Sequence, residues 1–237
     1  MSDFSGLEQS FALAGVPAVP QYDEACAYAP ASVDVQPHEV TFRRLRGPRD
    51  IAGILHLRNE IRLPVSVLAD PSFASREKKR DEAGLVGGFD RFGETIGTIR
   101  LVPMDRGLAP CEKLLARHAI APELACDSWE VGRLVLAPRF RSGPDALKRC
   151  LFLTLLHLID NTDVENLFAS CTPLLSRLYR RFGFDVLVKD ASCDEQGTYH
   201  LIHGTVPQVL RALAGNAEER ELAEDILALR EAAGALA

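Results

Sequence analysis

The clearest hydrophobic pattern lies in the middle of the chain. Residues 128–136 (SWEVGRLVL) form a mostly apolar run that is typical of a buried strand. Residues 139–147 (RFRSGPDAL) contain arginine and glycine and predict a loop, and residues 148–160 (KRCLFLTLLHLID) then predict a helix whose second half is largely apolar. The other predicted elements can be placed around this order of strand, basic loop and helix.

The remaining elements follow from the period of the apolar positions and from turn residues. The predicted strands cover residues 39–45, 83–89, 94–104, 128–136, 166–171, 184–189 and 198–203. The predicted helices cover residues 48–61, 72–82, 111–118, 148–160, 172–182 and 207–213. A four-residue turn with Gly93 predicts a hairpin, and residues 191–197 predict a further turn. This mixed order of strands and helices predicts an α/β (α+β) fold with a mixed sheet.

The chain divides into three predicted regions. Residues 1–37 are rich in Ala, Pro and Ser and predict an extended, weakly ordered arm. Residues 38–205 predict the α/β domain, and residues 206–237 predict a C-terminal helical extension. In its tail, Leu222, Ile226 and Leu229 are expected to share the apolar face of a helix.

Composition excludes several classes of function. The formal net charge of −6 gives no general reason to expect nucleic acid as a partner. Six cysteines without a C-x-x-C pair predict reduced thiols, and the start MSDFSGLEQS lacks the basic region of a secretory signal, so we expect a cytoplasmic protein. The longest apolar run, residues 150–159, is too short to span a bilayer.

Two charged residues interrupt the apolar central strand. Glu130 and Arg133 are costly to bury unless they are paired or needed for chemistry. One interpretation is a structural ion pair; the other is a general base, Glu130, with Arg133 fixing its geometry or binding substrate. Residues three apart on an ideal strand face opposite sides, so the two meet only if the strand bulges near Gly132.

The loop after the central strand is a candidate anion site. Arg139, Arg141, Ser142 and Gly143 combine guanidinium groups with backbone N–H groups ahead of a helix N-terminus. A surface loop rich in arginine is the alternative. The position between a buried strand and a helix favours binding of the pyrophosphate or phosphodiester of a thioester carrier.

Two further residues have a structural and a functional interpretation. Arg100 shares one face of its predicted strand with Ile96 and Thr98, and by pattern alone we expect it to face solvent. Tyr179 lies beside the apolar stripe of its helix, as a core tyrosine or as a phenol that protonates a leaving thiolate. His200 and His203 face opposite sides of a predicted strand, and we expect no metal site.

The order of strand, phosphate loop, helix, strand and a helix carrying LYRRFGF resembles the GNAT acyltransferase superfamily. Within that fold, GTIRLVP at 97–103 followed by WEVGRLVLAP at 129–138 resembles the acyl-homoserine-lactone (autoinducer) synthases and the related long-chain N-acyl amino acid synthases. The resemblance covers roughly residues 39–190. It implies a sheet of about six or seven strands, flanked by helices and splayed at the central strand.

The resemblance also implies the chemistry. The families share an arginine at the position of Arg100 and an E-x-x-R at Glu130 and Arg133. Arg141 is followed by Ser-Gly-Pro-Asp-Ala instead of the usual glycines of an acetyl-CoA loop, which favours the phosphopantetheine of an acyl carrier protein over free CoA as donor. Asp81 and Glu82 precede the hairpin without the spacing of the lactone synthases, which disfavours S-adenosylmethionine as acceptor.

The resulting hypothesis is an N-acyltransferase that acts on the amine of an amino acid or a related small metabolite. Glu130, directly or through a water, takes the amine proton, and Tyr179 protonates the thiolate. Backbone N–H groups near Leu134 or Val135 stabilise the oxyanion. Arg100 and Arg133 bind the acceptor carboxylate or hold Glu130.

The donor side of the hypothesis involves phosphate and protein contacts. Arg139, Arg141, Ser142 and Gly143 hold the donor phosphate, and no cofactor is bound permanently. An acidic carrier protein is expected to dock on a basic cluster of Lys148, Arg149, Arg177, Arg180 and Arg181.

Three rivals are retained: an acetyl-CoA-dependent N-acetyltransferase of a small amine, a lactone synthase, and a silent module that binds acyl thioesters. The acceptor, the acyl chain length, and the choice between monomer and dimer stay open.

Overall fold

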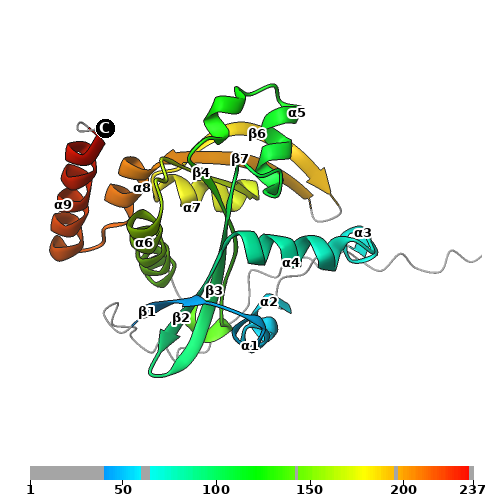
Figure 1. Ribbon diagram of the computed structural model, residues 1–237, viewed down its shortest axis with the longest axis horizontal. Coiled ribbons are helices and arrows are strands. Elements are labelled where there is room, and N and C mark those ends of the chain that lie inside the picture. The colour runs from blue at the N-terminus through cyan, green and yellow to red at the C-terminus, as the bar shows by residue number, and fades with distance from the viewer. Residues whose placement is uncertain (1–39, 60–64, 142–143, 195–196, 235–237) are drawn as a thin grey trace, which may run out of the picture. The chain divides into compact units, whose positions relative to one another are not determined.

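Seven strands form one mixed sheet in the computed structural model, which describes residues 40–59, 65–141, 144–194 and 197–234 (Figure 1). The predicted N-terminal arm lies outside these residues. The strand order is β1-β2-β3-β4-β5-β7-β6, and β4 and β5 are parallel while the other neighbours are antiparallel. The strands are β1 (Thr41–Leu45), β2 (Leu85–Arg91), β3 (Glu94–Pro103), β4 (Ser128–Leu136), β5 (Asn166–Cys171), β6 (Asp185–Asp194) and β7 (Gly197–Thr205). The predicted mixed sheet is confirmed.

The sheet splays at its central strand. β4 pairs with β5 only from Ser128, opposite Asn166, to Glu130, opposite Phe168. Both strands continue beyond these pairs, β4 to Leu136 and β5 to Cys171, so they separate from Glu130 onwards. The expected splay is therefore present, and Glu130 lies at its closed end.

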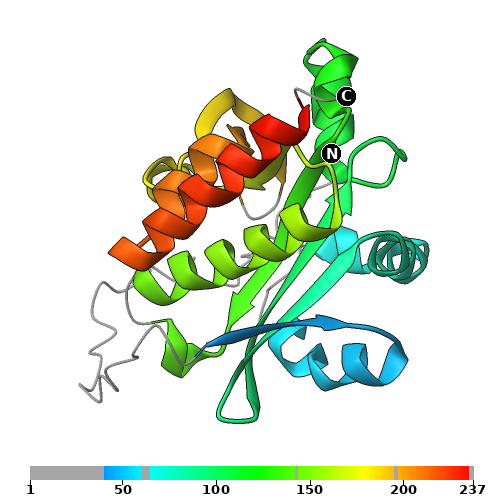
Figure 2. The same ribbon diagram turned by 60° about the vertical axis from the view of Figure 1, so that its left-hand side comes forward.

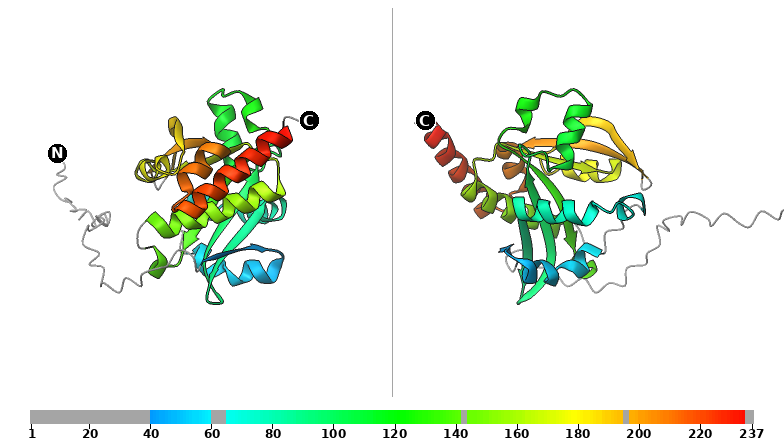
Figure 3. Two further views of the ribbon diagram at one scale, coloured as in Figure 1. Left: turned by 90° about the vertical axis from the view of Figure 1, so that its left-hand side faces the viewer. Right: turned by 45° about the vertical axis from the view of Figure 1, so that its right-hand side comes forward.

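Helices cover both faces of the sheet. The α-helices are α1 (Pro48–Gly53), α2 (Leu55–Asn59), α3 (Val65–Leu68), α4 (Phe73–Ala83), α5 (Pro110–Arg117), α6 (Pro144–Asn161), α7 (Pro173–Arg180), α8 (Val206–Leu213) and α9 (Ala217–Gly234). Short 3₁₀ turns lie at Pro122–Ala125 and Pro138–Phe140. Figure 3 shows α6 and α8 in front of the sheet in its left view, and α1, α2 and α4 in its right view. No helix in the described part of the chain is long and apolar enough to cross a membrane.

The apolar core follows this division. The main cluster joins α6 and α8 to one face through side chains such as Phe152, Leu155 and Val209. On the opposite face, α5 packs against β5 and β7 in a second cluster, and α1 and α2 form a third with Leu45 and Val135. Burial of these large side chains contributes about 1.5–3 kcal/mol each and holds the helices against the sheet.

A β-bulge in β4 changes which side chains share a face. Thr98 pairs with Val135 and Arg100 pairs with Gly132, so one residue of β3, Ile99, lies opposite Arg133 and Leu134. Arg133 has a φ of 52°, a left-handed conformation that is unfavourable for a side chain of this size. The bulge that the sequence required for Glu130 and Arg133 to share a face is therefore present, at the residue after Gly132.

The β2–β3 hairpin differs from its prediction in two ways. The strands extend to Arg91 and restart at Glu94, so the turn is the pair Phe92–Gly93, with φ values of 50° and 80°. Two positive φ values are typical of a type I′ turn. A register shift beside Phe89 also turns the Ile96 side chain into the main core. The expectation that Ile96 shares a face with Arg100 is therefore wrong.

The C-terminal part shows two more differences. β6 continues to Asp194 through the predicted turn at 191–197, because register shifts and a φ of 52° at Asp190 let the polar segment keep pairing with β7. In α9, which lies along α6 and α8 (Figure 2), Ala223 and Leu227 are buried while Leu222 and Leu229 are 43% and 71% exposed. The predicted apolar face of α9 is therefore wrong at Leu222 and Leu229, whereas Ile226 packs against the main core as expected.

An ion pair explains the rotation of α9. The buried Glu219 carboxylate pairs with Arg149 of α6 and accepts the Gly215 N–H at 2.6 Å. Fixing Glu219 inward also turns Ala223 and Leu227 inward, since residues four and eight positions along a helix share its face.

Candidate active site

Glu130 is a buried carboxylate at the closed end of the splay. Its side chain is on the α5 face of the sheet, and the residue is 8% exposed. Glu130 Oε2 accepts the backbone N–H of Cys111 at 2.5 Å, and the Cys111 thiol donates to the same carboxylate. Burial raises the pKa of Glu130, although the two Cys111 hydrogen bonds and the charge of Arg100 act in the opposite direction.

Helix α5 provides the environment of this carboxylate. Its first turn is held by Glu112, which accepts the Ala109 N–H at 3.1 Å and the Gly107 N–H at 2.7 Å. The helix presents its N-terminal end to Glu130 through the Cys111 N–H, an orientation that favours a negative charge. Gly132 leaves the space beside Glu130 Oε1 open, since a Cβ there would lie 3.7 Å from that atom.

Next to Glu130 lies a buried ionic network that we call the arginine network. It joins Arg58 of α2, Arg80 of α4, Arg100 of β3 and Arg133 of β4 to two carboxylates of α4, Glu77 and Asp81. All six side chains are between 5% and 15% exposed. Ion pairs this deep are rigid, because breaking one leaves an uncompensated buried charge.

Glu77 is the centre of the network. Its oxygens accept from Arg100 at 2.9 and 3.1 Å, from Arg133 at 2.7 and 3.1 Å, and from Arg80 at 2.8 Å. Burial by itself raises the pKa of Glu77, but Arg100 and the other guanidinium groups outweigh it and lower that pKa to about 2. Glu77 is therefore ionised at neutral and mildly acidic pH.

Asp81 forms the second link of the network. It accepts a bidentate pair from Arg58 at 2.7 and 3.0 Å and a longer contact from Arg100 at 3.4 Å. Sequence analysis did not identify Glu77 or Asp81 as partners of the site arginines. Their spacing of four residues on one polar helix was the available signal, since it places both on one face.

The structure corrects the expected surroundings of two arginines. Arg100 is 4% exposed, so the pattern-based expectation of a solvent-facing side chain is wrong. Arg133 reaches the Glu130 face through the bulge, and its hydrogen bonds among the described residues go to Glu77. Glu77 bridges Arg100 and Arg133, which the sequence had placed on two separate strands.

Tyr179 lies on α7, where that helix packs on the main core. Its ring makes edge contacts with Phe182 at 6.0 Å and Phe184 at 5.6 Å between centroids. Burial, and then the neighbouring Cys171 thiol at the end of β5, raise the pKa of Tyr179 to about 12. The phenol therefore carries its proton at neutral pH and can act only as a donor of that proton.

The two expected oxyanion donors differ in their place in the sheet. Val135 pairs with Thr98 of β3, whereas Leu134 lies in the bulge between the pairs Gly132–Arg100 and Val135–Thr98.

The loop that precedes α6 is described in part. Arg139 is exposed, pairs with Glu94 at the β2–β3 turn and lies 5.0 Å from the centroid of the Phe140 ring. Arg141 Nε donates to Leu136 O at 2.7 Å and so ties the loop to the end of β4. Ser142 and Gly143 lie outside the described residues.

The residues expected to dock a carrier protein fall into two groups. Arg177, Arg180 and Arg181 are exposed on α7 and at its end. On α6, Lys148 Nζ lies 3.5 Å from Ala214 O, and Arg149 is largely buried against Glu219. The first group forms a basic surface, whereas the second is engaged with the segment between α8 and α9.

The mixed, splayed sheet with helices on both faces and a buried carboxylate at the point of divergence defines a GNAT-type acyltransferase. A family model for the N-acyl amino acid synthase FeeM matches residues 68–203, more than half of the chain. The chain belongs to this family of N-acyl amino acid synthases and is an N-acyltransferase. The suspected family resemblance is thereby confirmed.

Two solved structures with TM-scores above 0.5 agree on the fold. FeeM from uncultured soil microbes is 16% identical with a TM-score of 0.55, and the match covers 73% of this chain and 95% of that chain. A spermidine N-acetyltransferase SpeG chimera from Vibrio cholerae and hSSAT is 14% identical with a TM-score of 0.51 over 73% and 98% of the two chains. The acyl-homoserine-lactone synthase LasI is 13% identical with a TM-score of 0.49 over 75% and 95%. No curated protein sequence matches the chain.

Proposed function

We propose that this N-acyltransferase moves an acyl chain from the phosphopantetheine thioester of an acyl carrier protein to the amine of an amino acid, with Glu130 as the general base. One observation carries this proposal: a buried carboxylate with a raised pKa lies where β4 and β5 separate. A base with a pKa above the usual carboxylate range is a better acceptor of an amine proton near neutral pH.

The proposed reaction balances as a simple acyl transfer. Glu130, directly or through a water, accepts a proton from the acceptor's ammonium group, and the free amine attacks the thioester carbonyl carbon. The N–H of Leu134 stabilises the resulting oxyanion. The C–S bond then breaks and Tyr179 donates its proton to the leaving thiolate, while the amine nitrogen, which became positively charged on attack, gives up its second proton to the Tyr179 phenolate through solvent, so that the neutral amide forms.

The carrier-protein donor is supported by charge and by the loop sequence. Arg177, Arg180 and Arg181 present an exposed basic surface that suits an acidic partner. Arg139 and Arg141 lie on the loop before α6 and are proposed, with Ser142 and Gly143, to hold the single phosphodiester of the donor. Lys148 and Arg149 are also proposed to dock the carrier protein. This role requires that their contacts with Ala214 and Glu219 break when the carrier protein binds.

The base assignment is tested by replacing Glu130 with glutamine and measuring amide formation from a long-chain acyl carrier thioester by mass spectrometry. We expect the rate to fall by about 10²–10⁴-fold, the usual contribution of a positioned general base. Glu123→Gln, which removes an exposed carboxylate seven residues earlier, serves as the control. An unchanged rate in the Glu130 variant would show that another group takes the proton.

The donor assignment has a separate test. Reversing the charge of Arg177 and Arg180 to glutamate should lower kcat/KM for the acyl carrier thioester by about tenfold and leave kcat/KM for the same acyl-CoA unchanged. Equal losses with both donors would contradict a docking role for α7. Saturable use of acetyl-CoA without any use of long-chain thioesters would favour an ordinary N-acetyltransferase instead.

A further inference from the structure

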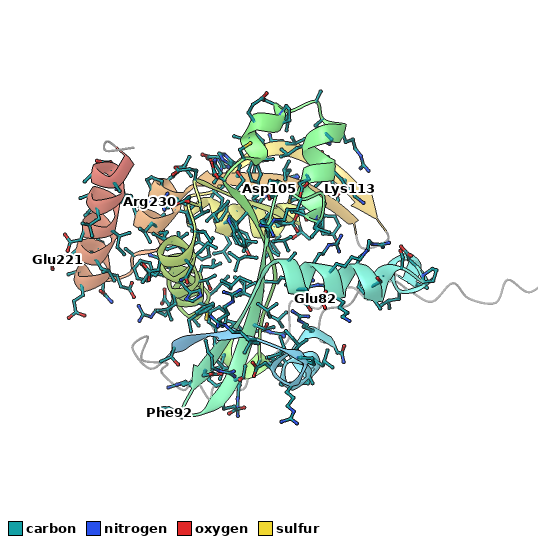
Figure 4. The ribbon with its side chains drawn as sticks, viewed as in Figure 1. Glu82, Phe92, Asp105, Lys113, Glu221 and Arg230 are labelled. Atoms are coloured by element: carbon teal, nitrogen blue, oxygen red, sulfur yellow. The ribbon has the colours of Figure 1, made fainter. Side chains whose placement is uncertain are left out.

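The tip of the β2–β3 hairpin exposes an aromatic side chain. Phe92 is 82% exposed, the largest value among the large apolar side chains that the structure describes, and Figure 4 labels it at the outer end of the hairpin. A single exposed apolar residue is common on protein surfaces, so exposure by itself does not indicate a partner. The turn and the neighbours of Phe92 supply the further evidence.

The geometry of the turn gives no reason for a phenylalanine at this position. Phe92 has a φ of 50° and Gly93 a φ of 80°, the two positive values of a type I′ turn. Such turns favour Asn, Asp or Gly at the first central position, and a left-handed backbone is unfavourable for a bulky side chain. Phe92 therefore serves neither the core nor the turn. A residue that is unfavourable for local structure is a candidate for function.

The hairpin tip is joined to the loop that precedes α6. The Arg91 guanidinium lies 5.1 Å from the centroid of the Phe92 ring and 5.8 Å from that of the Phe140 ring. Arg139, next to Phe140, pairs with Glu94 at the start of β3. These contacts hold the two segments together. We call Arg91, Phe92, Glu94, Arg139 and Phe140 the tip–loop surface.

The tip–loop surface lies beside the proposed phosphate site and carries an excess of positive charge. The hairpin tip and the described part of the loop contain three arginines, Arg91, Arg139 and Arg141, and one carboxylate, Glu94. The Arg139 side chain is 60% exposed. The excess remains positive when Asp145 of the first turn of α6 is included. A surface of this charge suits an acidic partner.

The chemistry of the proposed donor brings a protein to this surface. The phosphate of a phosphopantetheine arm is esterified to a side-chain hydroxyl of its carrier protein, so only a few bonds separate the phosphate from the protein. Holding that phosphate on Arg139 and Arg141 therefore places the carrier protein against the loop and the hairpin tip. Phe92 is then an exposed aromatic group beside arginines, the combination that is enriched in interface hot spots.

The adenosine part of CoA is the other group that this position could receive, because an aromatic ring stacks on a base. Two observations favour a protein. The Arg91 guanidinium already lies over the Phe92 ring, so part of the ring surface is covered. The loop after Arg141 also lacks the glycine spacing of an acetyl-CoA loop.

We propose that Phe92 is the apolar anchor with which the tip–loop surface binds the carrier protein of the acyl donor. This inference rests on the proposed function and adds to it a second docking element, at the phosphate end of the donor, besides the basic surface of α7. It assigns a role to a residue that sequence analysis treated only as part of a turn.

The variant Phe92→Asn removes the ring and gives the turn the Asn-Gly pair that type I′ geometry favours. We expect kcat/KM for a long-chain acyl carrier thioester to fall by roughly 5- to 30-fold, the effect of losing an interface hot spot of moderate strength. With the same acyl chain on free phosphopantetheine, which keeps the phosphate without the protein, and on CoA, kcat/KM should stay unchanged. The urea midpoint should stay equal or rise, which excludes unfolding as the cause of the loss.

Two control variants accompany this measurement. Leu229→Asn makes a similar change at a residue that is 71% exposed on α9, and it should leave kcat/KM unchanged with every donor. Phe92→Tyr keeps the aromatic ring and should keep kcat/KM for the carrier thioester within about twofold of the wild-type value.

Three results would overturn the proposal. The first is an unchanged kcat/KM of Phe92→Asn for the carrier thioester, and the second is an equal loss with all three donors. The third is a loss confined to acyl-CoA, because the ring would then bind the adenosine part and not a protein.

Calorimetric titration with holo acyl carrier protein, which bears phosphopantetheine without an acyl chain, separates this proposal from the proposed function. Wild-type binding that Phe92→Asn weakens by the same factor, without amide formation from any acyl carrier thioester, would overturn the acyl-transfer proposal and keep the anchor. Amide formation with equal kcat/KM in both proteins would keep acyl transfer and overturn the anchor.

Discussion

Two buried carboxylates on the same face of the sheet have opposite electrostatic environments. Glu77 accepts hydrogen bonds from three arginines, and its pKa is lowered to about 2. Glu130 accepts from the backbone and thiol of Cys111, both uncharged donors, and its pKa is raised. Burial acts in the same direction on both groups, so the difference comes from the partners.

This difference separates a structural anchor from a group that can exchange protons. A carboxylate with a pKa of about 2 is too weak a base to take a proton from an amine, whereas it holds α4 and three arginines together. Glu130 keeps its proton affinity because no guanidinium donates to it in the described structure, although Arg100 acts on it from nearby. The network thus supplies positive charge and fixed geometry, and Glu130 is the carboxylate to which the proposed function assigns the proton transfer.

The largest expected effect concerns stability. Glu77→Gln leaves Arg100 and Arg133 without their main buried partner and should lower the free energy of unfolding by about 3–5 kcal/mol in urea titrations. Glu82→Gln, on the same helix but exposed, should change it by less than about 0.5 kcal/mol. Glu130→Gln should cause no loss at pH 7, since it removes a charge that burial disfavours. Equal losses in the Glu77 and Glu130 variants would remove the distinction.

A second prediction concerns the pH dependence of stability. The folded-state pKa of Glu77 lies below its ordinary value of 4.5, so its ionisation stabilises the fold above that value, and the contribution is lost as pH falls toward 2. The stability advantage of the wild type over Glu77→Gln should therefore shrink by on the order of 2 kcal/mol between pH 7 and pH 3. Urea titrations at several pH values measure it. A constant advantage would mean that the Glu77 pKa is not lowered.

For Glu130 the sign is the opposite. Its folded-state pKa is raised, so ionisation above that pKa costs stability, and the cost disappears as pH falls below it. Glu130→Gln should therefore gain stability relative to the wild type as pH rises from the acidic range to neutral. A loss over the same range would contradict the raised pKa.

The smallest expected effect tests how Cys111 tunes Glu130. Cys111→Ala removes the thiol donor that stabilises the ionised carboxylate, so the pKa of Glu130 should rise further and the acidic limb of kcat/KM should move to higher pH. We expect a rate loss of about 2- to 10-fold at pH 6, comparable to one hydrogen bond. Cys111→Ser, which keeps a donor, should restore the profile. An alanine profile identical to the wild type would show that only the backbone N–H matters.

Local patterns predicted most of the framework. The strands at 128–136 and 166–171 were predicted at their observed bounds, because apolar runs bounded by polar or turn residues report burial directly. The start of α7 was also predicted, since the Thr172 hydroxyl accepts the Leu175 N–H and Pro173 begins the helix, although the helix ends at Arg180 and not at Phe182. The predicted splay and the need for a bulge between Glu130 and Arg133 also agree with the structure.

Long-range contacts decided what local patterns could not. The apolar face of α9 was mispredicted because the Arg149–Glu219 ion pair sets the rotation of the helix, although Leu222 and Leu229 are more apolar. The burial of Arg100 was missed because its partners, Glu77 and Asp81, come from a helix that looked uniformly polar and solvated. Each of these errors involves a charged pair far apart in sequence.

The sequence by itself determined the elements, their order, the family and the chemical types of the site residues, since these depend on local propensity and on motifs at fixed spacing. Only the tertiary structure decided that Glu77 binds the arginines and that Glu130, which no arginine contacts directly in the described structure, has a raised pKa. Pairing, burial and residual charge are properties of groups brought together from α2, α4, α5, β3 and β4, and no local pattern encodes their sum.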